Sequence, residues 1–293
     1  MQNRNFLFSE LLPVGNYINF NGNIVRSHEP VITAESRGLR YGDGIFETMR
    51  IAGDSIVLST FHFDRLFSGI QLLQFDQPAF FTREILTQQI NDLCSINNHR
   101  PWARVRLTVF RGKGGLYDPE NHIPNYIIDS QPLAAYNESI NKEGLVIDIF
   151  PDARKSMDVF SNLKSNNYLL YAMGALYAKK NQLNDCLLLN SQDRICDSTI
   201  ANIFCVKDKT VFTPYLSEGC VSGVMRRYLL IKLAEAGFSV QEKEIEVDWL
   251  QTVDEIFLTN SIYGIRWVQY LRDRSFKNEI TSSIYQRVIK NID

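Results

Sequence analysis

The sequence predicts an α+β protein of two domains: a small N-terminal α/β domain and a larger C-terminal domain with a mainly antiparallel, barrel-like sheet. A chain of 293 residues is long enough for two domains with a core each. Residues 132–142 are polar and aperiodic, as expected of a linker between domains at 1–131 and 143–293. In the second part, short apolar runs alternate with tight turns, which is typical of an antiparallel sheet or barrel.

The composition is that of a globular protein without a nucleic-acid or membrane partner. Hydrophobic residues make up 45% of the chain and charged residues 22%, with a net charge of -2. The five cysteines form no CxxC pair and the four histidines are dispersed, so we expect no metal site. Residues 1–12 lack the apolar core of a signal peptide, and no run is long enough to span a membrane. We therefore expect a soluble, cytoplasmic protein.

The N-terminal part is expected to be rich in strands. Asn21-Gly22 between two short apolar runs is a strong hairpin signal. Apolar residues spaced three to four apart predict one helix from Thr60 onward and another over 83–93. A glycine-bearing loop is expected at 111–118. The predicted strands are 17–20, 24–26, 44–51, 104–110 and 126–128.

The C-terminal part is expected to combine short strands with a long helix. This helix should run from Val224 to Ala236 and stop at Gly237, a suitable C-cap. The segment 282–290 is predicted to be helical as well. The predicted strands are 144–150, 186–190, 202–206, 211–213 and 256–259.

Lys164 is the first candidate for chemistry. It follows an expected turn at Pro151-Asp152 and precedes apolar residues spaced as in an amphipathic helix: Leu169, Met173, Leu176 and Tyr177. A lysine at such a helix entrance, among small polar residues, could keep a lowered pKa and form a Schiff base with an aldehyde. The alternative is an ordinary solvated lysine.

Three stretches could together bind a phosphate-sized anion. The amides of Val224 and Met225 follow Gly223 at the mouth of the long helix, where the helix dipole favours an anion. Ser261 follows a predicted strand, and the guanidinium of Arg65 could bind a phosphate through two hydrogen bonds. The alternatives are an ordinary helix start, a polar turn and a surface salt bridge.

Asp197 and Glu47 are the candidate acids. Asp197 lies in an otherwise uncharged stretch and could keep a pyridinium nitrogen protonated, or it could form a turn or a helix cap. Glu47 follows two glycines and could lie at a site or pair with an arginine. A serine hydrolase is disfavoured because the chain has no G-x-S-x-G motif, whereas a protein that only binds a cofactor stays open.

Taken together, these stretches resemble the fold-type IV pyridoxal-phosphate enzymes, a family of transaminases and lyases that includes the D-amino-acid transaminases. The resemblance spans residues 37 to about 268. The matching motifs, in family order, are Arg37-Gly38-x-x-Tyr41-Gly42-Asp43-Gly44-x-Phe46-Glu47-Thr48, His62-x-x-Arg65-Leu66, Lys164, Asp197-x-x-x-x-Asn202-Ile203-Phe204, Gly223-Val224-Met225-Arg226 and Thr259-Asn260-Ser261.

The resemblance implies a role for each candidate residue. Lys164 would form the Schiff base with pyridoxal 5'-phosphate (PLP) and move protons. Asp197 would contact the pyridine nitrogen, although the family usually has a glutamate there, which is one methylene longer. The family usually forms homodimers, with a loop of the second subunit over the site. The phosphate-binding residues would be Arg65, Val224, Met225 and Ser261.

Within the family, the motifs resemble aminodeoxychorismate lyase most. The strand 104–107 lacks the tyrosine and proline of branched-chain transaminases, and the loop 111–118 lacks the Arg–His pair of D-amino-acid transaminases. The lyase would release pyruvate from 4-amino-4-deoxychorismate and leave 4-aminobenzoate, a folate precursor. The alternatives are a branched-chain L-amino-acid or D-amino-acid transaminase and an inactive PLP-binding protein. The candidate substrate-binding residues are Phe46, Arg106, Arg111 and Lys113.

Overall fold

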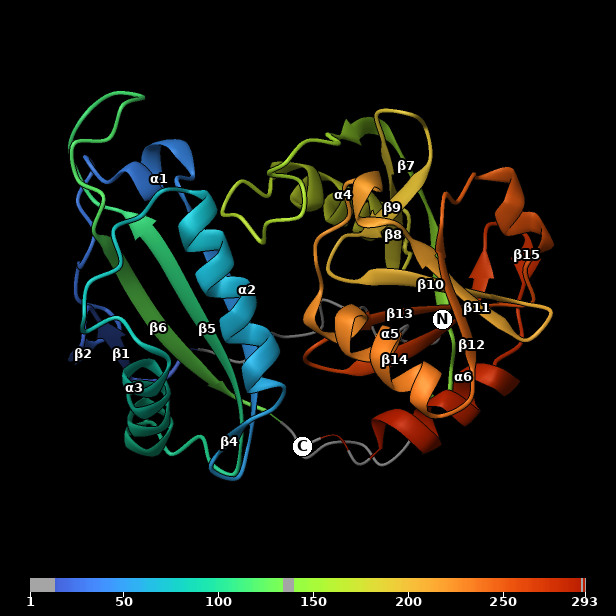
Figure 1. Cartoon of the computed structure of the whole chain (residues 1–293), viewed down its shortest axis with the longest axis horizontal. Helices are drawn as coiled ribbons and strands as arrows, with labels where there is room; N and C mark the ends of the chain where they lie inside the picture. Colours follow the sequence, from blue (N-terminus) through green and yellow to red (C-terminus); the bar gives the residue numbers. More distant parts are fainter. Residues whose placement is uncertain (1–13, 134–139, 291, 293) are drawn as a thin grey trace. The chain divides into compact units, whose positions relative to one another are not determined.

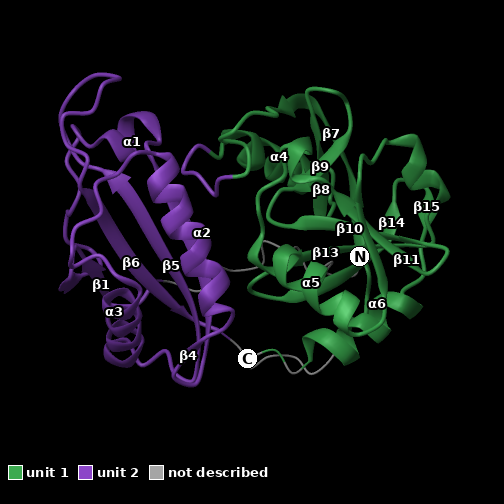
Figure 2. Cartoon of the chain, in the orientation of Figure 1, with its two compact units in different colours: residues 1–10, 136–162, 168–292 green, residues 11–135, 163–167, 293 purple. Residues whose placement is uncertain are grey.

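The structure is a computed structural model that describes residues 14–133, 140–290 and 292. These residues form two compact units (Figure 2). The N-terminal unit contains the described residues up to 133 together with Leu163–Asn167, and the C-terminal unit contains the others. The segment that carries Lys164 thus belongs to the N-terminal unit, although both of its flanks belong to the C-terminal one. Most of the linker expected at 132–142 lies outside the described residues.

The N-terminal unit is built on an antiparallel sheet of six strands in the order β2-β1-β6-β5-β3-β4 (Figure 1). Its strands are β1 Tyr17–Phe20, β2 Asn23–Arg26, β3 Gly44–Ala52, β4 Ser55–Ile56, β5 Trp102–Arg111 and β6 Pro124–Pro132. Its helices are α1 Arg37–Tyr41, α2 Ser59–Leu72 and α3 Arg83–Ile96. The core of the unit lies between the sheet and the helices α2 and α3.

Alternation along β5 separates the core face of this sheet from its other face. Arg104 and Arg106 are half-buried, while the apolar residues on either side of them are fully buried. The buried set on this strand is Ala103, Val105, Leu107 and Val109. In the core this set joins Leu66 of α2 and Ile90 of α3. The period of two therefore places Arg104 and Arg106 on the face opposite the core.

The elements predicted for this unit are confirmed, with wider bounds. The hairpin pairs Tyr17 with Arg26 and Phe20 with Asn23. Asn21 and Gly22 both have positive φ, 51° and 89°, as a two-residue hairpin turn requires.

The C-terminal unit is built on a sheet of nine strands in the order β12-β11-β10-β13-β14-β7-β8-β9, with β15 paired to β14. The pairs β11–β12, β14–β7 and β7–β8 are parallel and the other pairs are antiparallel. The strands are β7 Leu145–Lys155, β8 Asp185–Asn190, β9 Ile195–Ser198, β10 Asn202–Lys207, β11 Thr210–Pro214, β12 Ser239–Lys243, β13 Glu255–Asn260, β14 Gly264–Leu271 and β15 Arg274–Ser275. The α-helices are α4 Leu169–Lys180, α5 Val224–Glu235 and α6 Glu279–Ile284.

The connection from β9 to β10 explains why this sheet curls. β9 is the last strand at one end of the order and β10 is near the other end, yet only residues 199–201 join them. Three residues reach about 10 Å, so the two ends of the sheet must approach each other. The prediction of an α+β protein with a mainly antiparallel, barrel-like C-terminal sheet is confirmed. Asp197 in β9 and Asn202 in β10 lie at this closure.

Two local predictions around Lys164 were wrong. Pro151-Asp152 is not a turn before a helix, because both residues lie within β7, where the pairing with β8 shifts register between Ile149 and Arg154. A proline fits there because such an irregularity leaves its position without a ladder hydrogen bond. Lys164 is not at a helix entrance either, since α4 begins only at Leu169.

The helix predicted after Lys164 exists as α4, but of its predicted apolar stripe only Tyr177 packs against the core. Leu169, Met173 and Leu176 are 70%, 45% and 58% exposed, while Gly174 and Ala178 are buried. A Cβ at Gly174 would lie 3.1–3.2 Å from side chains of β8 and of the connection between β9 and β10. The helix therefore packs through Gly174 and Ala178 together with the larger Leu170, Tyr171 and Tyr177, and it leaves the other three residues of the stripe exposed. In the part of the chain that the structure describes, no helix has the length and apolar character needed to cross a membrane.

Candidate active site

Two backbone hydrogen bonds attach the Lys164 segment to the start of β3. The Phe46 amide donates to the Lys164 carbonyl, and the Asn166 amide donates to the Gly44 carbonyl, each over 2.9 Å. A Cβ at Gly44 would lie 2.7 Å from the side-chain nitrogen of Asn166, so this close approach requires glycine. The main chain of Lys164 is therefore held by a strand edge.

The ring of Phe46 contacts two cations. The Lys164 Nζ lies 4.4 Å from the ring centroid, and the guanidinium carbon of Arg106 lies 3.6 Å from it. Arg106 also donates from Nε to the Thr108 hydroxyl over 3.1 Å. Cations are attracted to an aromatic face. The structure thus brings three of the predicted site residues, Phe46, Arg106 and Lys164, into one cluster.

Arg65, predicted to bind phosphate, is held by Glu47. Its Nε donates to Glu47 Oε1 over 2.7 Å and its second terminal nitrogen donates to Oε2 over 2.6 Å, a two-bond geometry that is strong and directional. The same Oε2 lies 2.6 Å from Nδ1 of His62, which is fully buried. The expectation that Glu47 pairs with an arginine is confirmed. Arg65 therefore has one fixed orientation.

The charge states in this cluster follow from burial and from the neighbouring charges. Burial alone would raise the pKa of Glu47, but the charges of Arg65 and His62 and their hydrogen bonds lower this pKa to about 2. Burial lowers the pKa of His62, against the opposing effect of Glu47. The stable arrangement is therefore an ionised Glu47 against the buried ring of His62. Its buried Nε2 has no hydrogen-bond partner among the described residues.

Arg111, a predicted substrate-binding residue, is held by hydrogen bonds within the N-terminal unit. It donates to Asp43 Oδ1 over 2.7 Å and to the carbonyls of Leu73 and Gln74, and it is 5% exposed. Lys113, two residues further along, is exposed. Of the two cations expected in this loop region, only Lys113 projects into solvent.

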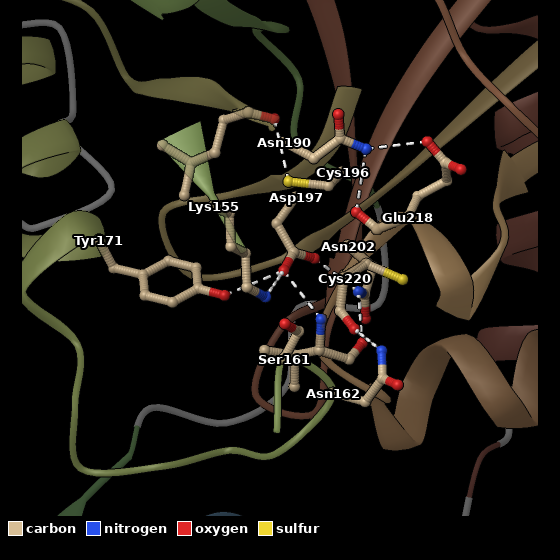
Figure 3. A network of polar contacts seen from close by, with 12 residues as sticks. Lys155, Ser161, Asn162, Tyr171, Asn190, Cys196, Asp197, Asn202, Glu218 and Cys220 are labelled. Carbon is tan, nitrogen blue, oxygen red and sulfur yellow. Dashed lines mark hydrogen bonds and ion pairs between the residues drawn. The ribbon is translucent and has the colours of Figure 1, made fainter. Parts of the chain in front are cut away.

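Asp197 is not a turn or cap residue but a buried strand residue with four donors, 2% exposed. Its Oδ2 accepts hydrogen bonds from Lys155 Nζ (3.0 Å), the Tyr171 hydroxyl (3.0 Å) and the Val221 amide (2.9 Å). Its Oδ1 accepts from Asn202 Nδ2 over 2.8 Å. Figure 3 shows Lys155 and Tyr171 reaching the same carboxylate from β7 and α4.

The N-terminus of α5 lies directly beside this network. Val224 and Met225 are buried, and the amides of a first helical turn have no acceptor within their own helix. No acidic residue lies in that turn, so the helix dipole is left to attract an anion. A Cβ at Gly223 would lie 1.9 Å from Asn202 Oδ1. Asn202 also donates to the Val221 carbonyl over 2.9 Å and so ties the helix mouth to Asp197.

Ser261 lies in the turn after β13, as predicted. Asn260, the last residue of that strand, accepts at Oδ1 from the amides of Ile262 and Tyr263 over 2.9 and 3.2 Å. This side-chain bond fixes the turn and with it the position of the half-buried Ser261.

The predicted residues thus form two sets, one in each unit. Lys164, Arg65, Phe46 and Arg106 belong to the N-terminal unit, and Asp197, Val224, Met225 and Ser261 belong to the C-terminal unit. Sequence reasoning missed Lys155 and Tyr171. Neither has a distinctive spacing to Asp197, because β7 and α4 bring them to it from 42 and 26 residues away.

Comparison with known proteins identifies the class. Residues 44–270 match the family amino-transferase class IV. The chain is 26% identical over 285 residues to aminodeoxychorismate lyase of Bacillus subtilis (strain 168), covering 93% of this chain and 94% of that protein. It is 26% identical over 250 residues to a branched-chain-amino-acid aminotransferase of Pseudomonas aeruginosa, covering 83% and 80%. The Escherichia coli branched-chain amino acid aminotransferase has the same fold, with a TM-score of 0.83 at 22% identity and coverage of 95% and 96%.

The chain belongs to the class IV aminotransferase family, whose members include transaminases and aminodeoxychorismate lyases. It is a PLP-dependent enzyme. The residues present fit this cofactor. A helix N-terminus suits the phosphate, and the buried Asp197 keeps Oδ1 with a single donor among the described residues.

Proposed function

We propose that this enzyme is 4-amino-4-deoxychorismate lyase, which releases pyruvate from its substrate and leaves 4-aminobenzoate. The observation that carries the proposal is the cluster of Lys164 and Arg106 on the ring of Phe46. A substrate derived from chorismate carries carboxylates, so it needs a cation beside the lysine that would hold the cofactor. The motif at 41–48 and the relative from Bacillus subtilis support the same activity.

We assign the cofactor contacts by the resemblance and by the chemistry of each group. Lys164 is the residue to which PLP is attached. Asp197 would contact the ring nitrogen, where a carboxylate favours a bound proton. Glu47 contributes indirectly because it holds Arg65 in one orientation. The phosphate-binding groups are Arg65, the amides of Val224 and Met225, and Ser261.

When bound, PLP supplies an electron sink that stabilises negative charge developing on the substrate. The protein supplies the rest. Lys164, with its main chain fixed on β3, holds and moves the proton at Nζ. Arg106 orients a substrate carboxylate relative to that amine, and this orientation lowers the entropy cost of the reaction.

A substrate assay tests the proposed activity. Aminodeoxychorismate should give 4-aminobenzoate and pyruvate with no keto-acid acceptor present. In parallel, branched-chain L-amino acids and D-alanine are supplied with 2-oxoglutarate. Turnover that requires the keto acid, without 4-aminobenzoate, would reject the lyase in favour of a transaminase. Bound cofactor with no turnover in any assay would indicate a protein that only binds PLP.

The Lys164→Ala variant tests the assignment of the lysine. Borohydride reduction of the wild type should leave the pyridoxyl group on Lys164, found by peptide mass mapping, and the variant should take up none. We expect its activity to fall by about a thousandfold or more, because one residue provides both attachment and proton transfer. Lys180→Ala, which removes an exposed lysine at the end of α4, is the matched control. A label that remains on the Lys164→Ala variant would contradict the assignment.

We also propose a cytoplasmic homodimer. The support for self-association, besides the resemblance, is the exposed apolar stripe of Leu169, Met173 and Leu176 on α4. Support for a reducing compartment comes from the five cysteines, all buried and unpaired. Sedimentation analysis should give twice the chain mass for the wild type and a monomer for Leu176→Asp. Ile231→Asp on α5, 44% exposed before the change, should stay dimeric.

A further inference from the structure

The Asp197 carboxylate is bound very unequally at its two oxygens. Oδ2 accepts from three donors, Lys155, Tyr171 and the Val221 amide, whereas Oδ1 accepts from Asn202 alone among the described residues. Three donors hold the carboxylate against rotation, so Oδ1 is the oxygen with acceptor capacity left. The carboxylate is thus oriented before any ligand binds.

One of the three donors carries a full charge. Lys155, at the end of β7, is 8% exposed, and its Nζ forms an ion pair with Asp197 over 3.0 Å. Lysine is almost never buried without a partner. Among the described residues, Lys155 is the only cation in an ion pair with Asp197. The buried carboxylate therefore has its counter-ion inside the protein.

The other groups around this pair are neutral. Burial, followed by the charge of Asp197, raises the pKa of Tyr171 well above its usual value, so its hydroxyl stays protonated and donates. Burial likewise raises the pKa of the Cys196 thiol, and it raises that of Cys220 to about 12. The charge at this place is consequently decided by Lys155 and Asp197 together.

We propose that Lys155 is a positioning and charge-balancing residue that limits how strongly Asp197 holds a proton on the ring nitrogen of PLP. The inference rests on the proposed contact between Asp197 and that nitrogen. A carboxylate that already has an ammonium at Oδ2 attracts a second cation at Oδ1 less than an unpaired carboxylate does, because the two positive charges repel each other. Lys155 and the ring nitrogen therefore compete for the charge of Asp197.

The competition predicts the direction in which stability and PLP affinity change when the charge of Lys155 is removed. Without the cofactor, loss of the Lys155 charge leaves a buried, uncompensated carboxylate, which is strongly unfavourable. With the cofactor bound, a protonated ring nitrogen can replace the missing charge. Removing the charge of Lys155 should therefore destabilise the cofactor-free protein more than the loaded one and should tighten the binding of PLP.

The test compares two ligands in four full-length proteins. The ligands are PLP and an analogue in which carbon replaces the ring nitrogen, and the proteins are the wild type, Lys155→Met, Lys155→Arg and Asp197→Asn. The measured quantity is the dissociation constant from equilibrium titration. We expect Lys155→Met to bind PLP about tenfold more tightly or better, since it removes one charge beside another in a buried site. Its affinity for the analogue should not change, and Lys155→Arg, which keeps the charge, should resemble the wild type.

A second measurement reports the protonation state of the ring nitrogen directly. With PLP labelled with nitrogen-15 in the ring, the signal of Lys155→Met should show the protonated form persisting to higher pH than in the wild type. Lys155→Gln, which keeps a donor and removes only the charge, should behave in the same way. Recovery of either variant in folded form only when PLP is supplied would also support the proposal, because the cofactor then replaces the missing counter-ion.

Two results would overturn the proposal. One is unchanged or weaker binding of PLP by both Lys155→Met and Lys155→Gln, and the other is an equal gain for the analogue, which would show that Lys155 acts on packing alone. Failure of the underlying cofactor contact is a different observation. If Asp197→Asn keeps the wild-type preference for PLP over the analogue, Asp197 does not contact the ring nitrogen, whatever the Lys155 variants do.

Discussion

Each unit holds one of the two candidate acids in a buried cluster with a cation, but the two clusters differ in how far apart their members lie in the sequence. Glu47 meets His62 and Arg65 from 15 and 18 residues away, through one strand and the helix that follows it. Asp197 meets Lys155 from 42 residues away, through non-adjacent elements of a curled sheet. The first cluster is local and visible as a motif. The second depends on closure of the sheet.

The clusters also differ in what they do with the cation. Arg65 donates hydrogen bonds from two of its nitrogens to Glu47, so in this cluster the acid fixes the orientation of the arginine. In the C-terminal unit the roles are reversed, because Lys155, Tyr171 and Val221 together hold the acid. A motif that places an acid near a base therefore does not say which of the two is the functional group. The number of hydrogen-bond donors around each carboxylate oxygen indicates which of the two is the functional group.

The largest effect is expected from Glu47→Gln. The change removes the buried negative charge that holds both Arg65 and His62, which should lower the free energy of unfolding by about 3–5 kcal/mol. Urea denaturation of the cofactor-free protein measures it. The matched control is Asp64→Asn, which breaks the half-exposed pair with Arg83 (3.0 Å) and should cost less than about 1 kcal/mol. Similar losses in the two variants would show that the Glu47 cluster is no stronger than a surface pair.

Lowering the pH should remove a large part of the contribution that Glu47 makes to the free energy of unfolding. The pKa of Glu47 is lowered from 4.5 to about 2, so the folded state binds fewer protons than the unfolded state in that interval and its stability falls as pH falls. The lowered pKa of His62 acts in the same direction below its ordinary value of 6.5. The stability difference between the wild type and Glu47→Gln should shrink by about 3 kcal/mol between pH 4.5 and 2. A difference that stays constant over this range would contradict the ionised Glu47.

The smallest effect is expected in the other cluster, from Tyr171→Phe. The variant removes one of three donors to Asp197 Oδ2 and keeps the charge of Lys155, so it should cost only about 1 kcal/mol of unfolding free energy. Tyr177→Phe on the same helix, which removes a bond to the less buried Asp148 over 3.1 Å, is the control and should cost less. A loss in Tyr171→Phe as large as in Glu47→Gln would mean that the hydroxyl, and not the charge of Lys155, anchors Asp197.

Much of the fold could be predicted from local patterns. The hairpin at Asn21-Gly22, the alternation of β5 and the end of α5 near Gly237 all follow from the residues themselves. Prediction failed where tertiary contacts override the pattern. Pro151 suggested a turn but lies at an irregularity in β7, and the apolar stripe of α4 suggested a buried face but is exposed at Leu169, Met173 and Leu176. In both places packing within or against the C-terminal sheet, and not the local sequence, determined the structure.

The sequence by itself determined the class of chemistry, because the motifs around Lys164, Asp197 and Gly223 are short and keep their order along the chain. Only the tertiary structure decided how those residues are supported. It fixed Lys164 on the edge of β3, turned Arg65 toward Glu47, engaged Arg111 within the fold and supplied Lys155 to Asp197. The physical reason is that a buried charge needs a partner within about 3 Å, and any distant segment that the fold brings there can provide one.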